Sequence, residues 1–471
     1  MTSGGLCRAE LEILRDRAAI EAEMLAQPRL WTDTIGALAA NVWRGVSSFA
    51  VDSPLLLLGA AGDVAGIRVG PLGVDSAAIR STKRLVRRGG PAYIKLGQLI
   101  ASSDGILPAR WAEAFAWCRD DAPRLSHRRI SSIIEREIGS TASLAELDPT
   151  PLAAGSIAQV HRAVLADGRH VVVKVRRPGL PRQLRADIGA LALAAAVAER
   201  LDEDALAANL PGFVELFAQL ALEESDFRLE ALNLQDCAAA FRACEMDWVT
   251  VPTPIEGLVS ERVLVMDQIE GVPYDRAAAE FGDRLDGPRL LSLAVGGVLS
   301  TALLHGVFHG DLHAGNVLVR RDGTFGLLDF GICGRFTDSQ RRSIARYLAG
   351  FAQGDAHAQV CALRDFGAVP ATSDELVAEL AGELERLAQR TDGAITFRRL
   401  GENASNQLSI LARHGFRMPK ELVLFFKNLL YLSSFAAAVA PQADLLTVIE
   451  SALSAVGARH ADQLGQLLGA S

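Results

Sequence analysis

The chain has 471 residues, of which 49% are apolar and 22% are charged, and its formal net charge is −8. This composition can build a large core, which excludes a disordered, collagen-like or low-complexity chain. The acidic balance argues against a nucleic-acid partner, because proteins that bind nucleic acid present a dominant basic surface. At about 150 residues per domain, the length predicts two to three domains.

The cysteines favour a reducing compartment. They form no CxxC motif and no paired spacing, which argues against a disulfide framework and a zinc ribbon. They stand at Cys7, Cys118, Cys237, Cys244, Cys333 and Cys361. Acidic residues are scattered through the first 23 positions, where a secretory signal needs an apolar run. We therefore expect a cytoplasmic protein.

The N-terminal part of the chain is helical in pattern. Residues 1–85 are rich in Ala and Leu, with breaks near Pro54 and around Pro71. Two helices are expected over 91–124, separated by a turn at 104–108. From 148 to 178 the pattern changes to Val-rich strands. Asp167-Gly168 between two of these runs predicts a β-hairpin.

The remainder is mainly helical. Leu and Ala recur every three to four residues over 182–242, which predicts helix. Short strands are expected at 248–251 and 261–268, then a long helix over 286–307 and a strand pair over 317–328. This is the element order of a two-lobed kinase. The predicted fold class is α+β: a bilobal protein-kinase-like fold with a small antiparallel N-lobe sheet, a helical C-lobe and a helical N-terminal extension.

Two apolar stretches reach the length of a membrane-spanning helix. Leu290–Phe308 has no Asp, Glu, Lys or Arg, but it contains serines, a threonine, a histidine and glycines and runs into a polar loop. Leu422–Ala440 carries Lys427 and Asn428 near its middle. A central Lys costs about 2.5–3.5 kcal/mol on membrane insertion. We therefore interpret both stretches as core helices.

Basic residues at helical spacing predict one basic helix face near the end of the N-terminal region. They are Arg80, Lys83, Arg84, Arg87 and Arg88. A solvated surface explains such a face. The alternative is docking on anionic lipid, which would make the protein peripheral on a membrane.

The strongest chemical signal comes from the segment HGDLHAGN at 309–316 and the Asp-Phe-Gly at 329–331. Asn316 follows Asp311 by five residues and Asp329 follows it by 18, as in the catalytic loop and DFG motif of kinases. Phosphoryl transfer needs a carboxylate near the acceptor hydroxyl and oxygen ligands for Mg²⁺. We assign the first role to Asp311 and the second to Asn316 and Asp329.

The run Val171-Val172-Val173-Lys174 matches the kinase strand that carries a phosphate-binding lysine. Because side chains alternate along a strand, Val172 and Lys174 share one face. Val172 would then lie under adenine while Lys174 reaches the α- and β-phosphates. Upstream, Ala153-Ala154-Gly155-Ser156 stands where a phosphate-covering loop is expected, although only Gly155 has an unrestricted backbone.

These residues and three further motifs resemble the UbiB/ADCK family of atypical kinases, over roughly residues 90–370. The motifs are KxGQ at 95–98, an Ala-rich loop at 153–156 in place of a Gly-rich one, and ExD at 224–226. The resemblance implies that ATP or ADP binds with Mg²⁺ and that the KxGQ helices occlude the groove where other kinases bind peptide. It further implies ATPase or restricted kinase activity in lipid metabolism, notably quinone biosynthesis. A lipid or prenyl-quinone intermediate and a membrane surface would then be partners. The regulatory residues would be Lys95, Gln98, Glu224 and Asp226.

Two glutamates in the helical segment 182–242 suit different partners. On one helix, Glu224 and Glu230 would diverge by about 120°, too far to serve one lysine. We predict that Glu230 pairs with Lys174 and positions it. Glu224 would instead meet Lys95 of the KxGQ motif.

The sequence departs from ordinary kinases and from the family pattern. Glu230 lies 56 residues after Lys174, which requires an inserted helix at 182–210. Gly155 stands where the family more often has Ala, which leaves the balance of ATP over ADP open. The hinge is expected near Met266-Asp267-Gln268-Ile269, because residues 263–266 have the pattern of a buried strand that ends there. No APE-type anchor follows the DFG motif, which argues against a conventional peptide-binding activation segment.

The predicted domains are a helical N-terminal region (1–85), a KxGQ helical extension (86–130), a kinase-like N-lobe with an inserted helix (131–266) and a helical C-lobe (267–471). The expected function is Mg-ATP-dependent phosphoryl transfer or ATP hydrolysis in lipid or quinone-type metabolism. One alternative is an aminoglycoside/choline-type small-molecule kinase, which has a similar catalytic loop but lacks KxGQ and ExD. Another is an ATP-sensing scaffold without turnover. A third reads His309, Asp311 and His313 as metal ligands, which leaves the Asp-Phe-Gly unexplained.

Overall fold

The computed structural model of the chain describes residues 8–27, 124–139, 143–201, 210–368, 374–389 and 419–469, with short pieces at 79–80, 83–84, 86–87, 93–95, 97–98, 113–115, 118 and 410. The chain divides into two compact units. Unit 1 comprises Met1–Phe227 and Gly257–Val265, and unit 2 comprises Arg228–Glu256 and Met266–Ser471. The breaks expected near Pro54 and Pro71, the turn at 104–108, Leu96 and Arg88 lie outside the described residues.

A five-stranded sheet has the order β1-β2-β3-β6-β5 and lies mostly in unit 1; the first residues of β5 and the last of β6 belong to unit 2. Its strands are β1 (Leu144–Ala154), β2 (Ala158–Leu165), β3 (His170–Arg176), β5 (Pro254–Val259) and β6 (Val263–Asp267). The hairpin predicted at Asp167-Gly168 is confirmed, because β2 and β3 pair antiparallel on either side of it. Gly168 has a φ of +86°, a conformation that favours glycine.

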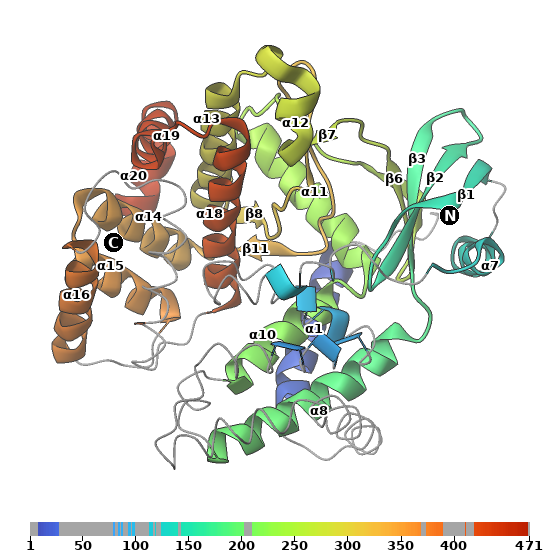
Figure 1. Ribbon diagram of the computed structural model, residues 1–471, viewed down its shortest axis with the longest axis horizontal. Helices are drawn as coiled ribbons and strands as arrows, with labels where there is room; N and C mark the ends of the chain where they lie inside the picture. Colours follow the sequence, from blue (N-terminus) through green and yellow to red (C-terminus); the bar gives the residue numbers. More distant parts are fainter. Residues whose placement is uncertain are drawn as a thin grey trace. The chain divides into compact units, whose positions relative to one another are not determined.

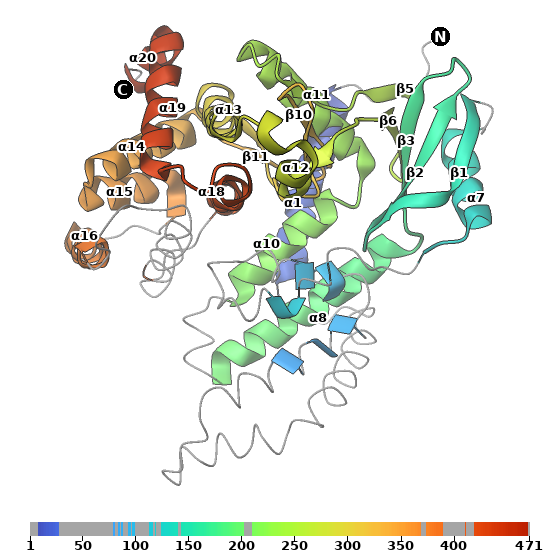
Figure 2. The same ribbon diagram turned by 45° about the horizontal axis from the view of Figure 1, so that its top comes forward.

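Helices cover and extend this sheet. α7 (His127–Ile138) buries Ile130, Ile133 and Ile134, three residues at helical spacing, and contacts β3. α1 (Arg8–Ala26), α8 (Leu180–Leu201) and α10 (Leu210–Glu223) pack on one another (Figures 1 and 2). α8 is the helix that the sequence predicts as an insertion. The short described pieces before residue 124 share a small core of Val86, Tyr93, Phe115 and Cys118.

Unit 2 contains two small sheets whose loops carry the kinase-like motifs. β4 (Val249–Thr250), β7 (Val272–Pro273), β9 (Val317–Val319) and β10 (Phe325–Leu327) form one sheet in the order β4-β10-β9-β7. β8 (Val307–His309) pairs antiparallel with β11 (Cys333–Arg335). The segment 310–316 therefore connects β8 to β9, and the Asp-Phe-Gly connects β10 to β11.

The other elements of unit 2 are helical. They are α11 (Phe227–Ala243, which begins at the last residue of unit 1), α12 (Tyr274–Phe281), α13 (Gly287–Ser300), α14 (Asp338–Gln353), α15 (Ala356–Leu363), α16 (Asp374–Gln389), α18 (Lys420–Val439), α19 (Leu445–Arg459) and α20 (Ala461–Gly469). The long helix predicted over 286–307 is α13 followed by a π-helical turn at Thr301–His305. α14, α15 and α16 pack in sequence order, and α13 lies against α18 and α19 (Figure 2).

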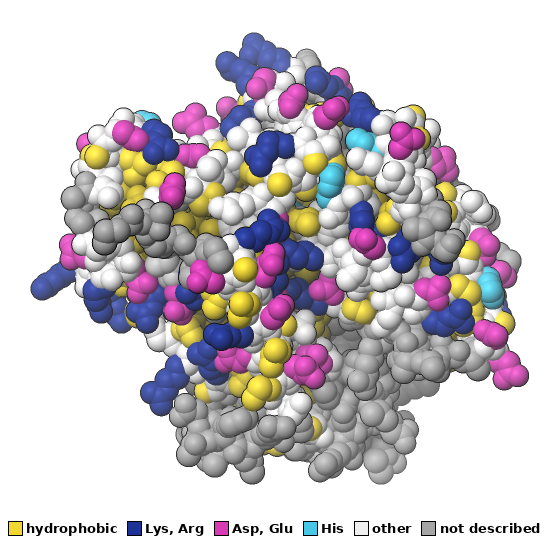
Figure 3. Space-filling view, turned by 180° about the vertical axis from the view of Figure 1, so that it is seen from behind, with side chains coloured by type: hydrophobic (Ala, Val, Ile, Leu, Met, Phe, Trp, Pro, Cys, Tyr) yellow, Lys and Arg dark blue, Asp and Glu magenta, His cyan; other side chains and the backbone are white. Residues whose placement is uncertain are grey.

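Two helices are long and apolar enough to cross a membrane by length and composition, Gly287–His305 and Lys420–Val439. Their apolar windows are 67% and 56% buried inside the protein. Packing within unit 2 therefore accounts for their apolar character, as in core helices. On the face shown in Figure 3, basic and acidic side chains are interspersed.

The contact between α13 and α18 yields a stability prediction. A Cβ on Gly287, at the start of α13, would overlap the carbonyl group of Val439 at the end of α18, whereas a Cβ on Gly296 of the same helix meets no atom within 4 Å. Gly287→Ala should lower the free energy of unfolding by about 1–3 kcal/mol through overpacking. Gly296→Ala should raise it by up to about 1 kcal/mol, because Ala favours helix over Gly. Denaturant unfolding of both variants tests this, and equal effects would contradict it.

A buried histidine in β2 yields a pH prediction. His161 is fully buried, with Nδ1 2.8 Å from the Asp148 carbonyl oxygen and Nε2 2.8 Å from the Gln159 amide nitrogen. The amide donates to Nε2, so Nδ1 carries the proton and the ring is neutral. Burial is the main cause that lowers the pKa of His161 below its ordinary value.

Since the unfolded chain binds this proton more tightly than the folded one, the contribution of His161 to stability is complete above a pH of about 6.5 and decreases as pH falls below it. We expect His161→Gln to lose less stability than the wild type between pH 7.5 and 5.5. Thermal unfolding at the two pH values measures this. If the wild type and His161→Gln lose the same stability between the two pH values, His161 does not contribute to the pH dependence.

Candidate active site

His309 lies at the centre of the catalytic-loop segment in unit 2. Its ring is almost fully buried; Nδ1 accepts a hydrogen bond from the Asp311 N–H at 2.9 Å, and Nε2 lies 3.0 Å from the Leu328 carbonyl oxygen. Nε2 therefore carries the proton and donates a hydrogen bond to the Leu328 carbonyl oxygen. Burial lowers the pKa of His309, and the negative charges of Asp311 and Asp329 oppose this only in part. A neutral imidazole thus links the backbone of Asp311 to that of Leu328, the residue before Asp329.

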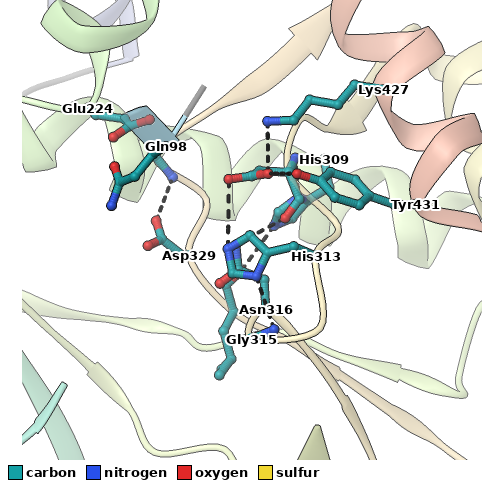
Figure 4. A network of polar contacts seen from close by, with 12 residues as sticks. Gln98, Glu224, His309, His313, Gly315, Asn316, Asp329, Lys427 and Tyr431 are labelled. Atoms are coloured by element: carbon teal, nitrogen blue, oxygen red, sulfur yellow. Dashed lines mark hydrogen bonds and ion pairs between the residues drawn. The ribbon is translucent and has the colours of Figure 1, made fainter. Parts of the chain in front are cut away.

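Asn316 closes the loop that Asp311 begins. Its side-chain Nδ2 donates to the Asp311 carbonyl oxygen at 3.0 Å, and its own carbonyl accepts from the Leu328 N–H at 2.8 Å. Because the amide nitrogen makes this bond, the amide oxygen is the atom suited to ligate a cation. The loop therefore presents an oxygen ligand from a buried residue (Figure 4).

Asp329 adopts a backbone conformation that is rare for a residue with a side chain. Its φ is +55°, and its Oδ1 lies 3.3 Å from the Gly331 N–H. Left-handed backbone at a non-glycine residue costs roughly 1–3 kcal/mol and persists only where the surroundings impose it. The next residue, Phe330, holds the backbone in place: its ring is fully buried, and its carbonyl accepts a hydrogen bond from the Asn233 side chain of α11 at 2.7 Å.

These donors fit a hard divalent cation. An Asp carboxylate and an Asn amide oxygen are the ligand types that Mg²⁺ takes when phosphate oxygens complete its shell. The reading of His309, Asp311 and His313 as a metal site is not supported, because both ring nitrogens of His309 are already bonded. Among the described residues, no three His, Cys, Asp or Glu side chains are arranged to hold a metal.

Two residues of α18 contact the carboxylate of Asp311. Lys427 Nζ lies 3.0 Å from Asp311 Oδ1, and the Tyr431 hydroxyl donates to that oxygen at 2.8 Å. His313 lies 3.8 Å from the other oxygen. Figure 4 shows Lys427 and Tyr431 pointing from their helix toward the loop that carries His309 and His313. Sequence reasoning missed both roles; the available signal was a Lys-Asn pair inside an otherwise apolar helix.

Unit 1 holds the strand and the loop expected to bind nucleotide. Lys174 and Val172 lie on β3 and are mostly buried, and Lys174 Nζ is 5.4 Å from the centroid of the Phe227 ring. Ala153 and Ala154 end β1, and Gly155 and Ser156 follow in the loop to β2. The strand that carries Lys174 and the two strands joined by this loop thus belong to one sheet.

The loop at 153–156 is tied on both sides. The Arg177 side chain donates to the Gly155 carbonyl at 2.9 Å, and the Ser156 hydroxyl donates to Gln98 Oε1 at 3.2 Å. A Cβ on Gly155 would meet only the Ala158 carbonyl oxygen, at 3.6 Å, so an alanine fits here. Glycine at 155 therefore adds backbone freedom rather than space, and Gln98 of KxGQ contacts this loop directly.

The structure contains the expected ion pair between Lys95 and Glu224, two half-buried side chains. The placement of Glu224 and Glu230 on one helix was wrong: α10 ends at Glu223 and α11 begins at Phe227. The break is held by buried groups. Ser225 donates its hydroxyl to the Leu222 carbonyl at 2.7 Å, and the buried Arg176 guanidinium donates to the Ser225 carbonyl.

Three other predicted residues are placed as follows. Asp226 donates its N–H to the Glu223 carbonyl at 3.3 Å in the turn between α10 and α11. Glu230 is buried in the first turn of α11, in unit 2. Met266 is buried on β6, where unit 2 resumes. Lys174 belongs to unit 1 and Glu230 to unit 2, so the pairing of these two residues stays a prediction.

The sequence model of the ABC1 atypical kinase-like domain matches residues 118–363, more than half of the chain. The chain belongs to the ABC1 family of atypical kinases. The α+β, kinase-like fold class and the UbiB/ADCK-type resemblance predicted from the sequence are confirmed. The match ends before α18, so Lys427 and Tyr431 lie beyond the ABC1 region, and Lys95 and Gln98 lie before it.

Relatives of this ABC1 protein are found in bacteria and plants. A Mycobacterium tuberculosis protein, named only as uncharacterized, is 33% identical and aligns over 79% of this chain and 80% of its own length. An Arabidopsis thaliana chloroplastic protein named as an aarF domain-containing protein kinase is 30% identical, over 77% and 72%. An Azotobacter vinelandii protein named as a probable protein kinase UbiB is 30% identical, over 76% and 67%.

The ion pair between Lys95 and Glu224 in this ABC1 chain can be tested by a double-mutant cycle. Lys95→Glu and Glu224→Lys should each destabilise the protein, and their combination should recover stability by about 0.5–3 kcal/mol relative to additivity. The exposed pair Asp167–Arg169, 2.8 Å apart, is the matched control, and reversing it should show coupling below about 1 kcal/mol. Thermal unfolding gives both values. Equal coupling in the two cycles would contradict a structural role for the pair.

Proposed function

We propose that this atypical kinase binds ATP with Mg²⁺ and uses it for phosphoryl transfer or hydrolysis. The observation that carries the proposal is the arrangement around His309, whose ring bonds the Asp311 N–H and the carbonyl of Leu328, the residue before Asp329. Asn316 adds a buried amide oxygen to the same loop. One carboxylate and two oxygen ligands are the groups that phosphoryl transfer requires.

Each residue would have a separate task in unit 2. Asp311 would orient the acceptor hydroxyl or water and accept its proton. Asn316 and Asp329 would hold the cation, whose charge neutralises the phosphate oxygens when it is bound. The strained Asp329 backbone supports this assignment, because such strain concentrates at functional sites.

In unit 1, Val172 would lie against adenine and Lys174 would bind the α- and β-phosphates. The loop Ala153-Ala154-Gly155-Ser156 would cover the phosphates, Met266 would mark the hinge, and Glu230 would position Lys174. The link from Gln98 to Ser156 and the pair between Lys95 and Glu224 support a regulatory role for KxGQ and ExD, to which Asp226 belongs.

The acceptor is proposed to belong to lipid or quinone-type metabolism rather than to be a peptide. The absence of an APE-type anchor after the DFG motif in the sequence supports a non-peptide acceptor, and the lipid or quinone class follows from the UbiB/ADCK resemblance. We propose a cytoplasmic protein whose basic residues at 80–88 form a solvated surface, with peripheral docking on anionic lipid as the alternative. Membership of the ABC1 family argues against an aminoglycoside/choline-type kinase.

Nucleotide binding is tested by thermal unfolding with ATP or ADP, with and without Mg²⁺. A ligand at 100 times its Kd stabilises by about 2.7 kcal/mol, which should raise the Tm by a few degrees. Asp329→Asn should abolish the Mg²⁺-dependent part. The same change at the exposed Asp322, in the turn between β9 and β10, is the control and should leave the shift intact.

Phosphate release, measured with and without anionic lipid vesicles, then tests turnover. Lipid-stimulated release would support the enzymatic proposal. Nucleotide binding without release would favour an ATP-sensing scaffold. A wild-type protein whose Tm responds to no nucleotide would refute the proposed function.

A further inference from the structure

Lys427 is a cation inside an apolar helix. It lies near the middle of α18, next to the fully buried Asn428, and its side chain is only 11% exposed. Burying an ammonium is unfavourable unless a counter-charge and hydrogen bonds compensate. The counter-charge here is Asp311, the residue assigned to the reacting hydroxyl.

Neighbouring contacts fix this ammonium at the catalytic loop. Asn428 donates its side-chain amide to the His309 carbonyl, which attaches α18 to the start of the loop. Tyr431, one turn after Lys427, donates to Asp311 Oδ1, and its ring centroid lies 5.4 Å from Lys427 Nζ. Two neighbouring side chains of the same helix, Asn428 and Tyr431, thus hold Lys427 and the loop in a single arrangement.

The ammonium has more donors than Asp311 uses. A lysine ammonium carries three N–H donors, and the single ion pair found for Lys427 among the described residues occupies one of them. Oδ1 of Asp311 already accepts from Lys427 and from Tyr431. The remaining donors are therefore available to a second anion beside the carboxylate.

The chemistry at Asp311 supplies such an anion. During phosphoryl transfer, negative charge spreads over the equatorial oxygens of the moving group, and positive groups fixed nearby stabilise it. Other cations of unit 2 near the motifs are committed elsewhere: Arg335 pairs with Asp236, and Arg341 pairs with Asp338.

We propose that Lys427 is a catalytic residue whose ammonium binds an equatorial oxygen of the phosphoryl group as it passes to the acceptor at Asp311. This inference rests on the proposed function. The bond between the γ-phosphorus and the β,γ-bridging oxygen breaks, and its electron pair leaves with ADP. The acceptor oxygen forms the new bond to phosphorus and gives its proton to Asp311. Lys427 stays protonated throughout, and Tyr431 is a positioning residue for Asp311.

Four variants test this inference: Lys427→Met, Lys427→Arg, Tyr431→Phe and, as the control, Lys420→Met at the start of the same helix. Lys427→Met keeps the side-chain length without the charge and should lower kcat for ATP by about 10²–10³-fold. KM and the nucleotide-induced Tm shift should stay within about threefold and one degree of wild type, because the lost contact forms only in transfer. Lys427→Arg should recover at least tenfold of the kcat. Tyr431→Phe should lower kcat by less than Lys427→Met, and Lys420→Met should leave it unchanged.

Removing one member of a buried ion pair destabilises a protein because the other charge is left uncompensated. We still expect the methionine variant to fold, since the Asp311 side chain is 21% exposed and keeps the hydrogen bond from Tyr431. If Asp311 left without its counter-charge prevents folding, Lys427→Gln provides the same kinetic test with a polar side chain. The inference is overturned if kcat stays within threefold in the uncharged variant, or if arginine recovers nothing.

Nucleotide binding is measured first, so that the two proposals fail in different ways. Wild-type protein that binds Mg-ATP without turnover would overturn the role of Lys427 and leave nucleotide binding intact. Absence of nucleotide binding would refute the proposed function, and the role of Lys427 with it.

Discussion

The neutral imidazole of His309 is the contact on which the candidate site depends. Its two nitrogens need opposite roles, since one accepts from the Asp311 N–H and the other donates to the Leu328 carbonyl. Only one neutral tautomer satisfies both partners, and burial favours that neutral form. The ring therefore fixes the distance between the loop that carries Asp311 and the end of the strand before Asp329.

Buried donors then attach distant helices to the backbone of the functional segments. In unit 2, Asn233 of α11 binds the Phe330 carbonyl and Asn428 of α18 binds the His309 carbonyl. In unit 1, Arg176 of β3 binds the Ser225 carbonyl. A buried carbonyl without a partner is unfavourable by about 1–3 kcal/mol, so each contact stabilises one arrangement of its segment. The same constraint sustains the left-handed backbone of Asp329.

Much of the site could be read from the sequence because its determinants are local. Asp311 and Asn316 belong to one loop, and the Asp167-Gly168 turn specifies its own hairpin. Alternation along β3 places Val172 and Lys174 together. The prediction of a single helix through Glu224 and Glu230 was wrong because of a tertiary contact. Arg176, from a strand 49 residues earlier, donates a hydrogen bond to the Ser225 carbonyl at the point where the helix would continue.

The sequence by itself determined the ABC1 family, the α+β fold class and the residues of the catalytic loop and DFG motif, because short-range spacing encodes strands, turns and loops. Only the tertiary structure decided that Gln98 binds Ser156 and that α18 brings Lys427 and Tyr431 to Asp311. Tyr431 lies 120 residues after Asp311, and no local pattern links them. Their contact exists because the apolar face of α18 packs into unit 2, which carries its few polar side chains to the catalytic loop.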